Sequence, residues 1–233
     1  MAAVGLWGGW HLLCFGIALP VAAYASRRKL ATQPLPPRVP FFTSVIVQQL
    51  LFLAISLGVA WGEAITLFPA ALPGAVPLGA TLLLLVVACV GMRPSWIQAV
   101  RDREPRVHLT SPRTPPERRL WVAVSLAAGI GEELTYRGVL YVLLWRLTDS
   151  VAAAALLSAF FFGAAHVVQG WKAIWITAVF GLVAQGLTLW SGSLYAAMVL
   201  HVGYDVVAGL AYGRLAEQLK YDSAVDDPSE ART

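Results

Sequence analysis

The apolar segment between Leu120 and Leu147 contains three charged side chains close together, Glu132, Glu133 and Arg137, and a fourth, Arg146, at its end. Charges at membrane depth are costly, so ionisable groups there indicate a functional site by default. On a helix, Glu133 and Arg137 lie four residues apart and share a face, whereas Glu132 points about 100° away. We expect Arg137 to keep Glu133 ionised and fixed, which leaves Glu132 free to act as a base. The alternative is a purely structural ion pair.

A histidine lies in the next apolar segment. His166 follows Phe162 by about one helical turn, and the residues between them are Gly163, Ala164 and Ala165. Small residues let helix backbones approach each other closely. We therefore expect His166 to reach across to the carboxylates of the preceding segment. The alternative is a core histidine without a catalytic role.

A third apolar segment contains His201 and Asp205, which are again four residues apart on one helical face. They could form a hydrogen bond that only orients the imidazole ring. They could also provide a second polar group, as oxyanion donors or as metal ligands. Several ionisable groups on three helices, with an arginine to balance them, favour a catalytic role over a purely structural one.

The composition indicates that lipid surrounds much of the chain. Of its 233 residues, 58% are hydrophobic and 13% are charged, against about 25% charged residues in soluble domains. The apolar runs are continuous and long enough to span a bilayer as helices. The fold class expected is an all-α, polytopic transmembrane helix bundle with about seven to eight helices. Seven runs are visible, at about 4–25, 41–62, 74–92, 120–147, 151–168, 173–190 and 194–213.

Two basic stretches, 26–40 and 93–119, set the expected orientation. Lys and Arg concentrate in cytoplasmic loops of membrane proteins, so we expect the N-terminus outside the cell membrane and both stretches in the cytoplasm. This placement explains the net charge of +4 without a nucleic-acid partner. The prolines of 93–119 predict a loop, within which 96–100 forms either a short interfacial helix or part of a solvated connector.

These patterns divide the chain into three parts. Residues 1–119 are expected to hold N-terminal transmembrane helices and basic cytoplasmic loops, and residues 120–213 a catalytic membrane core. Residues 214–233 are polar and are expected to form a disordered tail.

Several hydrolytic mechanisms lack their sequence signatures. There is no His-Glu-x-x-His zinc motif, and Ser193 has no nucleophile-elbow context. An aspartyl dyad would require a second intramembrane aspartate beside Asp205, and the apolar runs contain none. What remains is Glu-Glu-x-x-x-Arg, then Phe-x-x-x-His, then His-x-x-x-Asp.

Together these three motifs resemble the CPBP family, which includes CAAX prenyl proteases and the bacteriocin-processing or self-immunity proteins of the Abi family. The resemblance covers about residues 120–210. It implies a membrane bundle with a cavity open to the cytoplasm and a peptide bond as the target. It also implies these roles: Glu132 activates water, His166 assists it, Glu133 and Arg137 complete the first motif, and His201 and Asp205 stabilise the oxyanion.

One residue departs from the eukaryotic CAAX proteases, which end the last motif with asparagine. An ionised Asp205 cannot donate a hydrogen bond, so it must be protonated, orient His201 or bind a cation. We favour a mechanism without a cofactor. The alternative is zinc held through Glu132, His166, His201 and Asp205.

The expected partners are the lipid bilayer and a membrane-associated peptide or protein substrate. Two non-proteolytic functions stay open: a transporter or proton relay, and a catalytically silent immunity or scaffold protein.

Overall fold

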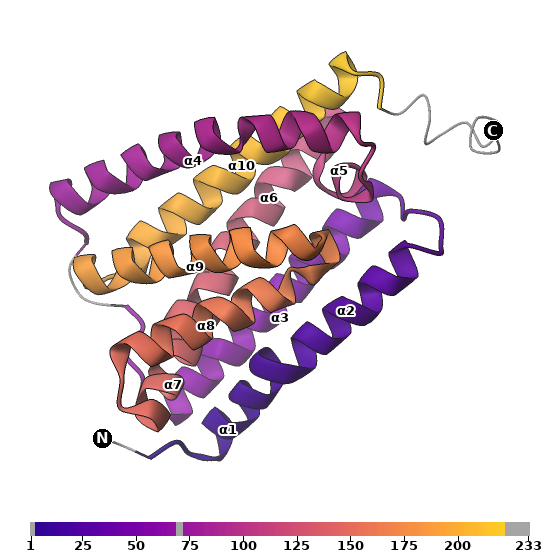
Figure 1. Ribbon diagram of the computed structural model, residues 1–233. Coiled ribbons are helices and arrows are strands. Elements are labelled where there is room, and N and C mark those ends of the chain that lie inside the picture. The colour runs from indigo at the N-terminus through magenta and orange to yellow at the C-terminus, as the bar shows by residue number, and fades with distance from the viewer. Residues whose placement is uncertain (1–2, 69–71, 222–233) are drawn as a thin grey trace.

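A computed structural model describes residues 3–68 and 72–221 (Figure 1). This part of the chain is helical and contains no strand, which confirms the predicted fold class. The elements follow one another as α1 (Leu6–Leu13), η1 (Cys14–Ala18), α2 (Leu19–Leu30), α3 (Arg38–Gly62), α4 (Ala75–Arg101), α5 (Pro105–Thr110), α6 (Pro115–Glu132), η2 (Glu133–Leu140), α7 (Tyr141–Thr148), α8 (Val151–Ala165), η3 (Val167–Gln169), α9 (Trp171–Ser191) and α10 (Leu194–Gln218).

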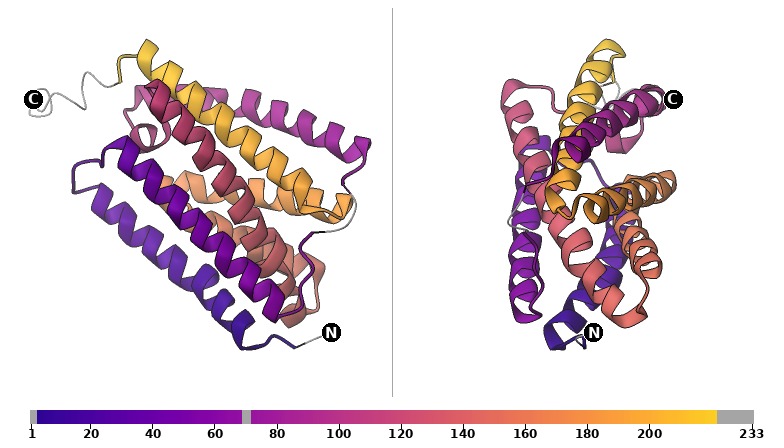
Figure 2. Two further views of the ribbon diagram at one scale, coloured as in Figure 1. Left: turned by 180° about the vertical axis from the view of Figure 1, so that it is seen from behind. Right: turned by 90° about the vertical axis from the view of Figure 1, so that its left-hand side faces the viewer.

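Among the described residues, five helices are long and apolar enough to cross a membrane: Leu6–Leu30, α3, α4, α9 and α10. The rod α6–η2–α7 is also long, and it carries the three charged residues. In Figure 2, α6 runs between α3 and α10. Large apolar side chains cover the outside of the bundle, for example Trp61 at 90% exposure and Val90 at 68%. Lipid is the solvent that such a surface requires.

Two tight turns join the helices that carry the histidines. Asp149, with φ 52°, and Ser150 connect α7 to α8, and the Ser150 hydroxyl accepts a hydrogen bond from the backbone N–H of Ala153. Gly192, with φ 67°, and Ser193 connect α9 to α10. A left-handed residue followed by an N-capping serine reverses the chain within two residues. Both tight hairpins predicted from the sequence are present.

The prediction of a loop across 93–119 is wrong for most of its length. Helix α4 continues through Pro94 to Arg101, so the 96–100 segment belongs to α4 and is neither a separate interfacial helix nor a solvated connector. Trp96 and Val100 are buried in a cluster with Ala208 and Tyr212 of α10. This packing stabilises a helix that the proline weakens locally. The short helix α5 and the start of α6 take up most of the remaining residues.

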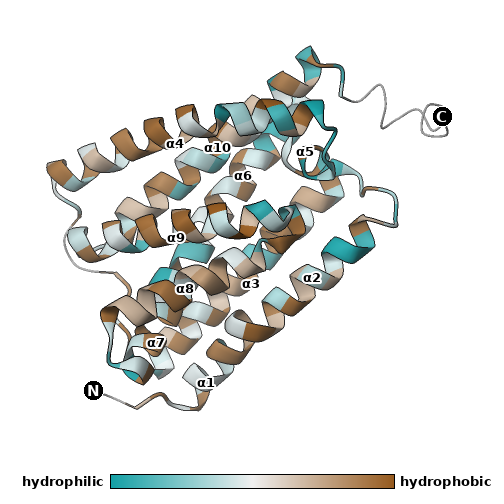
Figure 3. Ribbon diagram, in the orientation of Figure 1, coloured by the Kyte–Doolittle hydropathy of each residue, from teal (hydrophilic) through white to brown (hydrophobic). Residues whose placement is uncertain are grey.

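The two ends of the bundle differ in polarity. Figure 3 shows hydrophilic residues gathered where α2 ends and around α5, and α1 begins at the opposite end. At that opposite end the Glu63 carboxylate accepts hydrogen bonds from the N–H groups of Gly5 and Gly8 and pairs with Arg146 over 3.3 Å. The arginine furthest from the basic loops is therefore neutralised by an acid. Helix α10 extends to Gln218, so the prediction of a disordered tail is wrong for 214–218, and residues 222–233 lie outside the described part.

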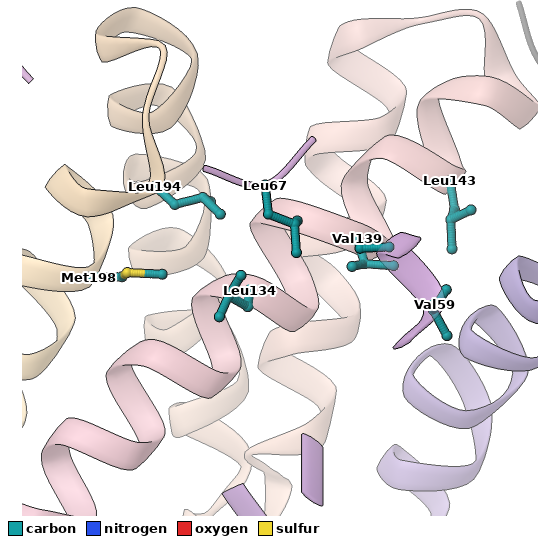
Figure 4. Packing of buried hydrophobic residues seen from close by; sticks show 8 residues of the cluster. Val59, Leu67, Leu134, Val139, Leu143, Leu194 and Met198 are labelled. Atoms are coloured by element: carbon teal, nitrogen blue, oxygen red, sulfur yellow. The ribbon is translucent and has the colours of Figure 1, made fainter. Parts of the chain in front are cut away.

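An apolar cluster packs around η2 (Figure 4). Leu134 and Val139 of η2 contact Val59 of α3 and Met198 of α10, and these side chains are at most 7% exposed. The cluster also includes Leu67, Leu143 and Leu194. Because η2 is packed on several sides, the charged residues on its remaining face are held in fixed positions.

Candidate active site

The three charged residues lie where the helix changes its winding. Glu132 is the last residue of α6, and Glu133 opens the π-helical turn η2, which also contains Arg137. Wide turns of this kind occur frequently at functional sites. Arg137 Nη1 lies 3.2 Å from Glu133 Oε1, and the two side chains are 1% and 0% exposed. The predicted ion pair is therefore present and sealed from solvent.

His201 is bound to this ion pair. Its Nδ1 lies 2.8 Å from Glu133 Oε1, across 68 residues of sequence. An ionised carboxylate only accepts hydrogen bonds, so Nδ1 carries the proton and Nε2 points away from Glu133. The nearest separation between His201 and Asp205 is 3.6 Å, too long for a hydrogen bond. The alternative in which His201 and Asp205 only bond each other is therefore not observed, because Glu133 is the partner of this ring.

His166 comes from the end of α8. Its Nδ1 donates to the carbonyl oxygen of Phe162 over 2.8 Å, which directs Nε2 toward Glu132. The predicted close approach of helices occurs at Gly163, although the neighbour is α9: a Cβ on Gly163 would clash with the carbonyl oxygen of Ile174. The small residues therefore position His166 by seating α8 against α9.

Both imidazoles converge on one oxygen of Glu132. The Oε2 atom lies 3.7 Å from His166 Nε2 and 3.8 Å from His201 Nε2. It has no hydrogen-bond partner among the described residues, whereas Oε1 accepts a 2.6 Å bond from Gln49 of α3. Both separations are too long for a direct hydrogen bond, and a polar contact of this kind is one at which a water molecule can take part. The arrangement can hold and deprotonate water at Oε2.

A cavity of about 540 Å³ contains this centre. Its polar lining includes Gln49, Glu132, His166, His201 and Asp205. Apolar side chains of α4 and α9 line it as well, and α5 contributes to the lining at the hydrophilic end of the bundle. Cavities of about 300–1,000 Å³ with few polar groups are the usual form of a small-molecule or peptide site.

The zinc ligands considered from the sequence are Glu132, His166, His201 and Asp205. Imidazole nitrogens and carboxylates are ligand types that zinc accepts. Across the described residues, however, no group of three or more His, Cys, Asp or Glu side chains has an arrangement that could hold a metal ion. Zinc binding stays an alternative to be tested.

Comparison with known proteins gives a single family. Residues 115–207 match the family model of type II CAAX prenyl endopeptidases, described as Rce1-like. Residues 115–207 are therefore similar to this family and form the Rce1-like segment. The match confirms the resemblance to the CPBP family, and all the motif residues from Glu132 to Asp205 lie inside it. The Rce1-like segment runs from α6 into α10, so the match does not include α1–α5. No curated protein and no solved structure matches the chain.

Two contacts to the site escaped the sequence analysis. Gln49 bonds Glu132, and the Trp121 indole N–H donates to the backbone carbonyl oxygen of Asp205 over 2.8 Å. Trp121 lies inside the Rce1-like segment, and Gln49 lies 66 residues before it (115 − 49). The available signal was the pair of amide side chains, Gln48-Gln49, near the middle of α3.

Proposed function

We propose that this protein is an intramembrane endopeptidase that hydrolyses a peptide bond in a membrane-associated protein or peptide, using water activated by Glu132. One observation carries the proposal: three helices bring Glu132, His166 and His201 together around a single unpartnered carboxylate oxygen inside a cavity. The Rce1-like match supports the broader class, a CAAX-type protease.

The proposed step uses side chains of this chain alone. Glu132 Oε2 takes a proton from water as the water oxygen forms a bond to the substrate carbonyl carbon. The carbonyl oxygen becomes negatively charged, and a protonated imidazole stabilises it by donating from Nε2. When the carbon–nitrogen bond breaks, the proton held by Glu132 passes to the leaving amine.

His201 is the better placed of the two imidazoles for the oxyanion. It lies against Glu133 at 2.8 Å, near Asp205 at 3.6 Å and near Glu132 at 3.8 Å. Negative charges at these distances favour the imidazolium form. Asp205 then acts by stabilising positive charge on His201. A carboxylate is suited to this role, so the asparagine found in the eukaryotic CAAX proteases is not required.

The walls of the cavity support a substrate that is partly in lipid. Val87 of α4 is 58% exposed, and Val179 of α9 is 63% exposed, and both residues also line the cavity. The cavity is therefore continuous with the lipid-facing surface between these helices. An extended peptide next to a lipid-anchored residue can enter such an opening without leaving the bilayer.

The decisive experiment compares the cleavage rates of two variants, one with Glu132 replaced and one with Glu217 replaced. Purified protein in liposomes is given an internally quenched peptide that ends in a farnesylated CAAX sequence. Replacement Glu132→Gln should lower the cleavage rate by about 10²- to 10⁴-fold, the usual contribution of a general base. The matched control is Glu217→Gln, because that side chain is 50% exposed. Undiminished cleavage by Glu132→Gln would rule out Glu132 as the base.

Metal dependence is tested with the same peptide. We expect cleavage to be unchanged after incubation with 1,10-phenanthroline, and we expect the purified protein to carry less than stoichiometric zinc. Loss of cleavage with recovery on adding Zn²⁺ would favour the zinc alternative.

A further inference from the structure

The carboxylate of Glu132 is held by a side chain from outside the Rce1-like segment. Gln49 of α3 donates from Nε2 to Glu132 Oε1 over 2.6 Å. Its side chain is 4% exposed and lines the cavity. We infer that Gln49 is a positioning residue that sets the orientation of Glu132, an inference that rests on the proposed role of Glu132 as the base.

The chemistry of the amide fixes which of its ends faces Glu132. An ionised carboxylate accepts hydrogen bonds and cannot donate one, so the amide nitrogen of Gln49 must face it. The other end, Oε1, is buried and has no hydrogen-bond partner in the described part of the chain. A reversed amide would place its Oε1 next to the carboxylate, and neither group could then donate a hydrogen bond. The contact with Glu132 therefore determines the orientation of the Gln49 amide.

The backbone of Gln49 lies close to Gly131, the residue before Glu132. A Cβ on Gly131 would lie 3.0 Å from the backbone oxygen of Gln49 and 3.3 Å from its Oε1. The lack of a side chain at Gly131 is therefore what allows α3 to approach α6 directly beside Glu132. This backbone contact brings Gln49 close to Glu132, so its side-chain amide can reach the carboxylate.

Fixing Oε1 determines where the reactive oxygen points. With Oε1 bound to Gln49, Oε2 is the atom that faces His166 and His201, at 3.7 and 3.8 Å. Without Gln49 the carboxyl group can rotate, and Oε2 then leaves the point where both imidazoles meet. A misplacement of about 1 Å in a catalytic group can cost about 10²-fold in rate.

The kinetic test uses two adjacent glutamines. We expect Gln49→Met to lower kcat by about 10- to 100-fold with KM unchanged, since the substrate still binds while the base is misplaced. Gln48 is the matched control because it is next in sequence but exposed. Gln48→Met should keep the wild-type kcat. A normal kcat in Gln49→Met, or an equal loss in both variants, would overturn the inference.

A second variant separates positioning from folding. In Gln49→Glu, a protonated carboxyl at position 49 can donate to Glu132, whereas an ionised one repels it. Activity of this variant should recover as the pH falls, relative to wild type at the same pH. The ionisable groups that face the pair are Glu132, Glu133 and Arg137 of α6–η2, His166 of α8, and His201 and Asp205 of α10. These groups are present in both proteins, so the ratio of the variant's activity to the wild-type activity at each pH reports the effect of the residue at position 49. A ratio independent of pH would overturn the inference.

A spectroscopic readout is independent of cleavage. The infrared carboxylate band that disappears in Glu132→Gln belongs to Glu132, and it should shift in Gln49→Met but stay in place in Gln48→Met. An unshifted band in Gln49→Met would show that the hydrogen bond does not form. A shifted band in a protein that cleaves no CAAX peptide would instead count against a CAAX-type substrate and leave the Gln49–Glu132 bond standing.

Discussion

Arg137 is the residue on which the buried charges depend. Its guanidinium lies 3.2 Å from Glu133, stacks 3.9 Å from the centre of the Phe162 ring and donates from Nε to the carbonyl oxygen of Gly181. It therefore joins η2, α8 and α9 around one cation. Glu133 also accepts the hydrogen bond from His201 Nδ1. Loss of the Arg137 guanidinium would therefore disturb the position of His201 through Glu133.

Removal of Arg137 should destabilise the whole protein. Arg137→Ala leaves Glu133 buried without its cation, and breaking a buried pair in this way costs about 3–5 kcal/mol. We expect a lower steady-state amount in membranes and a lower thermal unfolding temperature in detergent. Arg118→Ala is the control, because its pair with Glu217 is exposed and worth at most about 1 kcal/mol. Equal abundance of the two variants would argue against a stabilising role for the ion pair.

At the level of elements, the contact between α8 and α9 positions His166. Gly163 lies one turn before the histidine, and its missing side chain leaves room for the backbone of Ile174 and for Ala178. Helix α8 ends at Ala165, so His166 takes its direction from the last turn of this helix. A change in the separation of the two helices therefore moves Nε2 relative to Glu132.

A single methyl group at this contact should disturb the site. Gly163→Ala would place Cβ against the Ile174 carbonyl, and overpacking of this kind costs about 1–3 kcal/mol. We expect a lower unfolding temperature together with a lower kcat. Gly186→Ala in α9 is the matched control, because nothing lies within 4 Å of a Cβ there. It should be neutral or more stable by up to about 1 kcal/mol. If Gly163→Ala behaves like the control, close packing does not position His166.

For the whole molecule, the basic end of the bundle and the cavity lie together. Arg106 and Thr110 of α5 line the cavity at the end where the arginines gather, and Glu63 pairs with Arg146 at the other end. By the positive-inside rule the site then faces the cytoplasm. The orientation is a proposal that rests on the distribution of charge.

Cysteine labelling tests this orientation. In a chain with Cys14 and Cys89 replaced by alanine, a membrane-impermeant maleimide should label Thr148→Cys in intact cells. It should label Arg101→Cys only after the membrane is opened. Both positions are exposed and lie at opposite ends of the bundle. The reverse pattern would place the cavity on the outer side.

The sequence by itself determined the helices and the chemical groups. Long apolar runs specify membrane helices because each backbone polar group must be satisfied within its own segment. A spacing of four residues specifies a shared face, and this is why the Glu133–Arg137 pair could be predicted. The three motifs also predicted the family, because they depend on local order along the chain.

Only the tertiary structure decided which groups meet. The partner of His201 is Glu133 rather than Asp205, Glu132 is held by Gln49 from a helix outside the motifs, and α4 continues through Pro94 because α10 packs against it. In each case the deciding contact joins residues far apart in the sequence. Local spacing fixes the face of a helix but not the neighbour that this face meets, and that neighbour is chosen by packing across the whole bundle.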